Sequence, residues 1–219
     1  MKAVVVLSGG QDSATALAMA VRKHGAGEIA AITFSYGQRH AVETDYARNL
    51  AESVFKIAAW QCVPLDFYGA VTDNALFSKS DPILPGAVCP NTVVEGRNAI
   101  FLQIAAVWAK RLGAKEVWTG VSEADFSGYP DCREVFVKAE QRAIRLALDY
   151  PIRIVTPFMH LTKADEWALA DELGIFDVID EQTVTCYNGV PGKGCGKCPA
   201  CRLRNRGRRD YLQRKRAAK

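Results

Sequence analysis

The sequence predicts an α/β fold in which a Rossmann-like, doubly wound parallel sheet is followed by a small cysteine-rich module. Three observations support this fold class. Short apolar segments rich in β-branched residues alternate with longer amphipathic segments along most of the chain. A glycine-rich turn at residues 8–13 joins the first of these segments to the second. Four cysteines lie close together within residues 186–201.

The strands are expected at short apolar runs, because such runs are typical of strands that are buried on both faces. In chain order they are residues 3–7, 28–34, 62–65, 116–119 and 153–156. The helices are expected where apolar residues recur on one face, as Val42, Tyr46, Leu50 and Val54 do. They are residues 13–20, 41–54, 99–112 and 134–148, then a helix capped by Thr162, with Asp165 at the capping-box position and Gly174 just beyond its end.

Two connections look functional. Residues 69–96 contain three prolines and little periodicity, and they are too long for an ordinary connection. Residues 120–133, GVSEADFSGYPDCR, form a polar stretch after the fourth strand. In parallel sheets, ligands bind beyond the carboxyl ends of the strands. We therefore expect SGGQDS, SYGQRH, EGRN and GVSEADFSGYPDCR to converge on one site.

The glycine-rich turn SGGQDS predicts a phosphate or pyrophosphate site. Gly9 and Gly10 remove two Cβ atoms, and Asp12 or Ser13 can cap the following helix. The N–H groups at a helix start favour an anion. Neither G-x-x-x-x-G-K-[ST] nor G-x-G-x-x-G occurs there, which excludes the two commonest phosphate loops. An ordinary capped turn is the alternative.

Composition limits the class of protein. With 219 residues, 49% hydrophobic and 24% charged, the chain suits one compact domain with a small appendage. The N-terminal segment does not match a secretory signal, and no apolar run reaches the length of a membrane span, so a cytoplasmic protein is expected. The net charge of +4 is uneven, because residues 202–219 are strongly basic. That segment is expected to bind a polyanion or to form a solvated helix.

Cys186, Cys195, Cys198 and Cys201 follow the pattern C-x8-C-x2-C-x2-C, which predicts one closed structural Zn²⁺ site per subunit. Gly194 and Gly196 would let the backbone fold back so that its N–H groups face the sulfurs. An iron–sulfur cluster and a thiol–disulfide role are alternatives. We therefore divide the chain into an α/β domain at residues 1–180 and a zinc-binding module with a basic helix at residues 181–219.

Taken together, these motifs resemble a known family. SGGQDS is similar to the pyrophosphate loop of the ATP pyrophosphatases. The chain also contains YGQRHAVE (36–43), GRN (96–98), DFSGYPDCR (125–133), LTKADE (161–166) and CGKCPACRLR (195–204). On these motifs it resembles, within that superfamily, the 7-cyano-7-deazaguanine synthases of the queuosine pathway over residues 1–204.

The resemblance implies an adenine nucleotide α-hydrolase-like fold and a ligase reaction. The enzyme would convert 7-carboxy-7-deazaguanine, ammonia and ATP into 7-cyano-7-deazaguanine through an adenylated carboxylate and an amide. Mg²⁺ would bridge the phosphates. The resemblance also implies a homodimer that acts on small molecules, without a membrane and without binding nucleic acid directly.

The resemblance, combined with residue chemistry, gives the expected site. The nucleotide-binding residues are Leu7, Ser8, Gly9, Gly10, Gln11, Asp12, Ser13, Ala14 and Thr15. The catalytic residues are Lys163, Arg97, Asp12, His40 and Glu43. The substrate-binding residues are Arg39, Asn98, Asp125, Tyr129 and Asp131.

Among these, the resemblance places Lys163 near the phosphates, and Asp12 is the candidate to hold Mg²⁺ or its waters. His40 and Glu43 share a helix face and could bind ammonia or transfer protons. For Lys163, Arg97 and Arg39 the alternative is a solvated or salt-bridged side chain, and for His40 and Glu43 it is an exposed contact. Asp125 or Asp131 could instead cap a turn.

Two other functions remain open. One is a tRNA-modifying ATP pyrophosphatase, a thiolase or an amidine-forming ligase, in which the zinc module and the basic tail would hold RNA. Its weakness is that only Tyr211 interleaves with the basic residues of the tail. The other is a zinc-containing, adenine-nucleotide-binding interaction protein without catalysis, against which Lys163, Arg97 and the complete loop argue.

Overall fold

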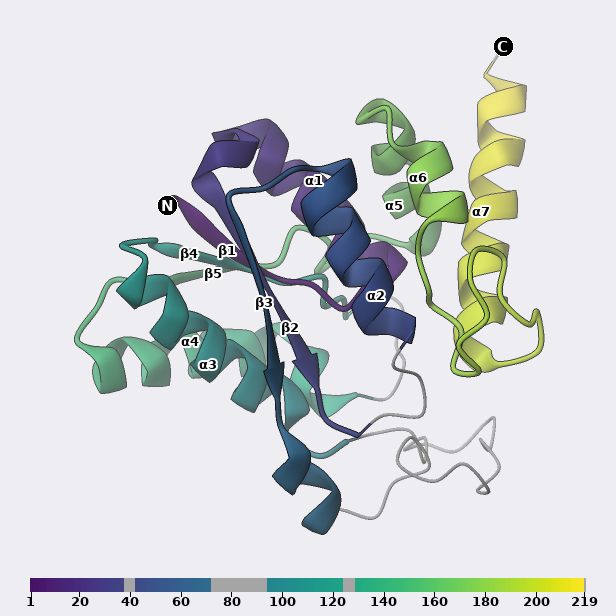
Figure 1. Cartoon of the computed structure of the whole chain (residues 1–219). Helices are drawn as coiled ribbons and strands as arrows, with labels where there is room; N and C mark the ends of the chain where they lie inside the picture. Colours follow the sequence, from purple (N-terminus) through teal and green to yellow (C-terminus); the bar gives the residue numbers. More distant parts are fainter. Residues whose placement is uncertain (38–41, 72–93, 124–128, 219) are drawn as a thin grey trace.

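The computed structural model describes residues 1–37, 42–71, 94–123 and 129–218. At its centre lies a five-stranded sheet in the order β3-β2-β1-β4-β5, in which every pairing is parallel (Figure 1). The strands are β1 (Ala3–Val6), β2 (Ile29–Ser35), β3 (Ala59–Pro64), β4 (Glu116–Trp118) and β5 (Arg153–Val155). The predicted doubly wound parallel sheet is therefore confirmed.

Helices cover both faces of this sheet (Figure 1). They are α1 (Gln11–His24), α2 (Val42–Asn49), α3 (Arg97–Arg111), α4 (Glu134–Leu148), α5 (Lys163–Glu172), α6 (Phe176–Glu181) and α7 (Pro199–Ala217). Helices α3 and α4 pack on one face, whereas α1, α2 and α5 contribute to the core on the other.

The residues of β1 show why the sheet is covered twice. Val4 belongs to the core that α3 builds with Ala105 and Ala106. Ala3 and Val5 belong to the opposite core. All three β1 residues are fully buried, as expected for alternate side chains of a central parallel strand.

Several boundaries differ from the prediction. The third strand begins at Ala59 instead of residue 62, because Ala59 and Trp60 pair with β2 and the indole of Trp60 donates to the Thr33 hydroxyl. Glu28 lies in a 3₁₀ turn before β2. The capping box at Thr162 and Asp165 is confirmed. Of the predicted long loop, residues 72–93 lie outside the described part of the chain.

The start of the first helix differs from the prediction. The sequence predicts that Asp12 or Ser13 caps it, but α1 begins at Gln11 and its N-cap is Gly10. The hydroxyl of Ser13 instead accepts the N–H of Ser8 and donates to the carbonyl of Gly10. The Ser13 hydroxyl therefore forms hydrogen bonds within the glycine turn. The carboxyl group of Asp12 contacts Lys163 instead of capping the helix.

The carboxyl ends of β1 and β4 meet at the point where the strand order reverses. Gly120, two residues after β4, packs directly on the start of α1. A Cβ atom at Gly120 would lie 2.7 Å from the backbone carbon of Asp12. The turn after β1 and the segment after β4 thus lie together at the switch point, where ligands bind in such sheets.

The C-terminal helix α7 packs against α5 (Figure 1). The contact is closest at Gly207, where a Cβ atom would lie 2.4 Å from the Cβ of Lys163. Several basic residues of α7 contact acidic residues of α5 and α6, as Arg214 does with Asp165 and Arg208 with Asp180. Within the described ranges, none of the helices combines the length and the apolar character that a bilayer crossing requires.

Candidate active site

The glycine turn after β1 is held in a shape that requires glycine. Gly9 has a φ of +85°, and a Cβ atom there would lie 2.5 Å from the carbonyl oxygen of Glu43. The hydroxyl of Ser8 lies 3.0 Å from that of Ser13 and accepts the N–H of Gly10. The two serines predicted to bind the nucleotide therefore order the turn itself.

Gln11 marks a place for a ligand atom at the start of α1. Its side chain is 1% exposed, and neither its amide nitrogen nor its amide oxygen has a partner within the described residues. Buried polar groups in native proteins are normally paired. Its backbone N–H donates to the hydroxyl of Thr185 at 3.3 Å. The unpaired amide fits the predicted anion site next to the turn.

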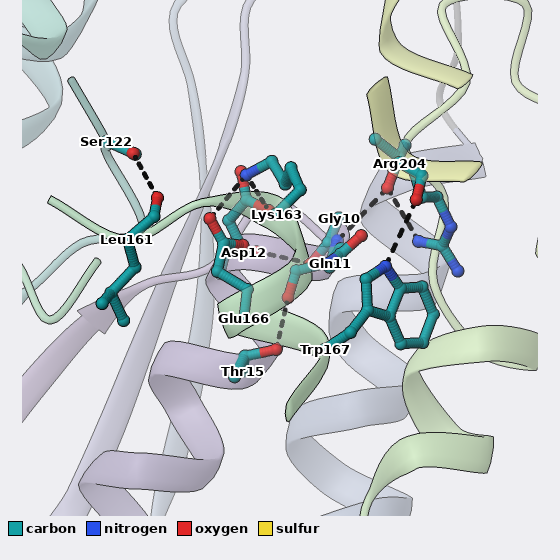
Figure 2. Close-up of polar contacts among 12 residues, drawn as sticks. Gly10, Gln11, Asp12, Thr15, Ser122, Leu161, Lys163, Glu166, Trp167 and Arg204 are labelled. Atoms are coloured by element: carbon teal, nitrogen blue, oxygen red, sulfur yellow. Dashed lines mark hydrogen bonds and ion pairs between the residues drawn. The ribbon is translucent and has the colours of Figure 1, made fainter. Parts of the chain in front are cut away.

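Lys163 connects this turn to α5. Its ammonium nitrogen lies 2.8 Å from Oδ1 of Asp12 and 2.7 Å from Oε1 of Glu166 (Figure 2). Lys163 begins α5, so the capping box at Thr162 fixes the backbone from which the side chain extends. The side chain of Glu166 is fully buried, and that of Lys163 nearly so. The structure thus brings together two predicted catalytic residues, Lys163 and Asp12.

The three charges influence one another. Burial favours the neutral form of Asp12, but the Lys163 ammonium and a hydrogen bond from Glu166 outweigh it and lower the pKa of Asp12. Burial and the negative charge of Asp12 raise the pKa of Glu166 well above its usual range. Burial opposes the charge on Lys163, but the two carboxyl groups outweigh it and raise the pKa of Lys163. The shifts therefore favour the ionised form of Asp12, the charged form of Lys163 and the protonated form of Glu166.

An ionised Asp12 at the phosphate turn suits Mg²⁺. This ion prefers oxygen ligands and is commonly held by one or two carboxylates together with substrate phosphates. The donor set therefore fits the predicted ion.

Three other residues predicted to bind the nucleotide lie in the core. Leu7 and Ala14 are fully buried among apolar residues, and the hydroxyl of Thr15 donates to the carbonyl of Gln11. Their side chains stabilise the strand and the helix on either side of the turn. That these residues contact a nucleotide stays a prediction. Because their side chains are occupied in the core, such a contact would involve their backbone atoms.

A second group of polar residues surrounds Arg97, the first residue of α3. Its guanidinium donates to the hydroxyl of Tyr36 at 3.0 Å, and its Nε is buried without a partner in the described residues. Burial opposes the charge of Arg97, but the surrounding hydroxyl and carboxyl groups raise its pKa overall. Burial raises the pKa of Glu43 to about 7, although Arg97 opposes this shift. Glu43 can therefore exchange a proton near neutral pH.

Asn98 and Asp131 lie in contact, and Asp131 caps a helix where the alternative to substrate binding was a turn cap. The carboxylate of Asp131 accepts the N–H of Asn98 at 2.9 Å and so caps the start of α3. Its other oxygen is buried without a partner in the described residues. The Asn98 amide donates to the sulfur of Cys132, whose pKa is raised to about 12 by burial first and by Asp131 second. Cys132 is therefore a neutral thiol.

Tyr129 lies beside the C-terminal module, because its hydroxyl is 3.2 Å from that of Tyr187. The predicted residues Arg39, His40 and Asp125 lie outside the described part of the chain.

The four predicted metal ligands form one cluster. The sulfurs of Cys186, Cys195, Cys198 and Cys201 all lie within 4.8 Å of one another. The N–H groups of Cys195, Cys198 and Cys201 donate to neighbouring sulfurs, as the glycine spacing predicted. Gly194 has a φ of +67°, and a Cβ atom there would lie 2.3 Å from the sulfur of Cys201. Four converging cysteine sulfurs suit a structural zinc ion.

Sequence reasoning did not assign Glu166, Thr185 or Arg204 to the site. The position of Glu166 three residues after Lys163 on one helix could have indicated the contact. Thr185 and Arg204 approach the turn from distant parts of the chain, and no local pattern indicated that. Arg204 is buried, and its guanidinium donates to the hydroxyl of Thr185.

Comparison with known proteins identifies a family and a group of similar solved structures. The model of a family described as "Queuosine biosynthesis protein QueC" matches residues 2–212. The chain is similar to a 4-thiouridine synthetase solved with RNA and bound ATP, with a TM-score of 0.52 and 20% identity over 97% of this chain and 50% of that one. It therefore spans about half the length of that synthetase.

The chain is also similar to a protein from Methanocaldococcus jannaschii described as a predicted subunit of tRNA methyltransferase. The TM-score is 0.50 and the identity 16%, over 78% of this chain and 75% of that one. At these identities the two structures support the fold alone.

Proposed function

Because this chain belongs to the QueC family of queuosine biosynthesis proteins, the 7-cyano-7-deazaguanine synthases, we propose how its residues carry out that ATP-dependent reaction. The contact of Lys163 with Asp12 at the glycine turn carries the proposal. It places a buried cation beside the turn where the pyrophosphate of ATP would lie, and such preorganised charge stabilises a leaving anion.

The first step activates the substrate acid. A carboxylate oxygen of 7-carboxy-7-deazaguanine forms a bond to the α-phosphorus of ATP, and the bond from that phosphorus to pyrophosphate breaks. Pyrophosphate leaves onto the start of α1, with Lys163 balancing its charge. The Gln11 amide is available to bind a phosphate oxygen, since its polar atoms are buried and unpaired within the described residues. The product is an acyl adenylate.

Ammonia then attacks the acyl carbon, AMP leaves, and an amide forms. The amide oxygen takes a second AMP group from a second ATP. Loss of that AMP, together with the two protons of the amide nitrogen, produces the nitrile. Each nitrile therefore requires two ATP and releases two AMP and two pyrophosphate ions.

Proton transfer is assigned to Glu43, with His40 as its partner. A carboxyl group whose pKa is about 7 can accept a proton from the attacking nitrogen and return it to solvent near neutral pH. Arg97 is assigned to the carboxylate of the substrate, because its Nε is buried beside Tyr36. Arg39, Asn98, Asp125, Tyr129 and Asp131 remain the proposed contacts of the deazaguanine.

Two metal ions belong to the proposal. Asp12 would hold Mg²⁺ or its waters, and the ion would neutralise charge on the phosphates. Cys186, Cys195, Cys198 and Cys201 would hold one structural zinc ion per subunit. The six cysteines in the described part of the chain form no disulfides, which supports a reducing, cytoplasmic location. From the resemblance we also propose a homodimer that does not bind nucleic acid directly.

The test replaces the carrying residue. We expect Lys163→Met to lower the rate of nitrile formation by about 100-fold or more, because removal of one charge-stabilising group has effects of that size. The matched control is Lys138→Met, since Lys138 is exposed on α4 and pairs only with Glu134 among the described residues. Nitrile and AMP are followed together by mass spectrometry. Equal activity of the two variants, or AMP release that depends on added tRNA and not on the acid, would refute the proposal.

A further inference from the structure

Arg204 is a buried cation whose hydrogen-bond acceptors are neutral. Its residue exposure is 1%. One terminal nitrogen donates to the hydroxyls of Thr183 and Thr185 at 2.8 and 2.9 Å, and the other donates to the carbonyls of Ile179 and Asp180 at 2.6 and 3.2 Å. Burial of a charged group is costly unless it is well paired. A buried guanidinium with such partners therefore suggests a positioning task.

Thr185 connects Arg204 to the glycine turn. The Thr185 oxygen accepts the N–H of Gln11 in addition to the bond from Arg204. The neighbouring Val184 donates its N–H to the carbonyl of Gly9 at 2.9 Å. The segment before the first metal-ligand cysteine thus holds the turn at both of these residues.

The cysteine cluster fixes both ends of this connection. Cys186 follows Thr185 directly, and Cys201 lies about one helical turn before Arg204 on α7. Their sulfurs lie in the same cluster. On the other side of Arg204, its guanidinium packs 5.3 Å from the ring of Trp167 on α5. Arg204 therefore lies between the metal cluster, the turn and the helix that carries Lys163.

We propose that Thr185 and Arg204 are positioning residues, which hold the start of α1 in the shape that receives pyrophosphate. In this proposal the cysteine cluster fixes Thr185 and Arg204, and through them it helps to shape the ATP site. The buried positive charge of Arg204 also adds to the potential that favours a phosphate at this helix start. This inference rests on the proposed pyrophosphate position.

Thr185→Val tests the connection, because valine keeps the shape of threonine and removes the hydroxyl. We expect the KM for ATP and the Kd for inorganic pyrophosphate, measured by calorimetry on the zinc-loaded enzyme, to rise about five- to tenfold. The KM for 7-carboxy-7-deazaguanine should change less than about twofold. Thr185→Ser keeps the hydroxyl and should restore both constants.

Thr183→Val is the matched control. It removes a hydroxyl that accepts from the same nitrogen of Arg204 but is bonded on its other side to the carbonyl of Ile179. We expect a lower Tm with unchanged affinities for ATP and pyrophosphate. Zinc content is measured for every variant, so that loss of metal is recognised.

Lys163→Met separates this inference from the proposed function. If Lys163→Met weakens pyrophosphate binding while Thr185→Val leaves it unchanged, the positioning role is wrong and the pyrophosphate site stands. If both variants bind pyrophosphate as tightly as the unaltered enzyme, the proposed site itself is wrong. Equal weakening by Thr183→Val and Thr185→Val would also overturn the positioning role, because it would indicate a general loss of structure.

Discussion

At the scale of single residues, the protonation of Glu166 determines the net charge of the trio of Asp12, Lys163 and Glu166. With Glu166 protonated, the single charges of Asp12 and Lys163 cancel. With Glu166 ionised, the trio would carry a net negative charge beside the phosphate turn and would repel ATP. The pKa of Glu166 is raised, first by burial and then by Asp12, and this shift acts against that repulsion.

This balance predicts different effects for the two carboxyl groups. Glu166→Gln imitates the protonated form, so we expect kcat within about fivefold of the unaltered enzyme. Asp12→Asn removes the ionised partner of Lys163 and the proposed Mg²⁺ ligand, and we expect kcat to fall about 100-fold or more. Steady-state kinetics at pH 7.5 with saturating Mg²⁺ measures both. A Glu166→Gln enzyme as inactive as the Asp12→Asn enzyme would show that Glu166 acts as an anion.

Glu43 predicts a pH dependence of stability. Its pKa is raised to about 7 in the folded protein and is close to 4.5 when unfolded. Between these values the folded state holds a proton that the unfolded state has lost, so the free energy of unfolding falls as the pH rises from about 4.5 to 7. We expect the loss to amount to roughly 1 to 3 kcal/mol.

Glu43→Gln cannot lose a proton and should flatten this part of the stability curve. Urea unfolding at pH 5, 6, 7 and 8 measures the effect, with Glu52→Gln on the same helical segment as the control. Identical pH profiles for the Glu43→Gln and unaltered proteins would mean that Glu43 titrates near its ordinary pKa.

Some residues of the candidate site could be predicted from the sequence. The glycine turn, Asp12 and Lys163 carry motifs, and the structure brings them together. The task of Asp131 was ambiguous, because a carboxylate can cap a backbone or bind a substrate, and here one oxygen caps α3. Arg204 could not be assigned, since a basic residue in a basic tail gives no local sign of burial.

At the scale of elements, the pairing of α5 and α7 decides where Lys163 lies. Gly207 lets the two helices approach so closely that any side chain there would meet the Cβ and the backbone of Lys163. Glycine inside a helix costs about 1 kcal/mol relative to alanine. Its presence at this position is explained by the close approach.

Gly207→Ala should therefore destabilise the protein, although alanine has a higher helix propensity than glycine. Propensity alone would stabilise α7, but we expect a lower Tm and about a tenfold or larger loss of kcat, because α5 or α7 must move and Lys163 moves with it. Gly27→Ala is the control, since a Cβ atom there meets nothing within 4 Å. A raised Tm with full activity in Gly207→Ala would contradict the account.

The element order and the parallel sheet could be predicted because apolar runs alternate so regularly. The ends of the elements could be predicted less well. The third strand gained Ala59 and Trp60 through pairing with β2, which is a tertiary effect that a local pattern does not contain. Helix α6 was missed, because Phe176–Glu181 is short and follows a helix stop at Gly174.

At the scale of the whole molecule, part of the positive charge of the C-terminal segment is paired within the chain. Arg208 contacts Asp180, Arg214 contacts Asp165, and Lys215 contacts a further acidic residue of α5. The exposed pairs among these, such as Arg214 with Asp165, add little stability. They do lower the positive potential that a polyanion would meet, which favours the small-molecule reading of the enzyme over the RNA-binding one.

Metal removal tests how the two parts of the molecule depend on each other. We expect one zinc ion per chain, and we expect its removal by a chelator to lower the Tm by more than about 10 °C, because metal binding stabilises the folded module. Affinity for pyrophosphate should fall in the same titration. Cys62→Ser, which alters a thiol outside the cluster, should keep its zinc. Full stability after complete loss of zinc would contradict this coupling.

If one site activates the substrate twice through adenylation, both carboxylate oxygens of the substrate are transferred to AMP, and isotope labelling can follow them. The enzyme is given 7-carboxy-7-deazaguanine labelled with ¹⁸O in both carboxylate oxygens, with ATP, Mg²⁺ and ammonium, and the products are weighed by mass spectrometry. Two adenylation steps predict two AMP per nitrile, each carrying one ¹⁸O atom on its phosphate, and unlabelled pyrophosphate. Label in water or in inorganic phosphate, with unlabelled AMP, would contradict it.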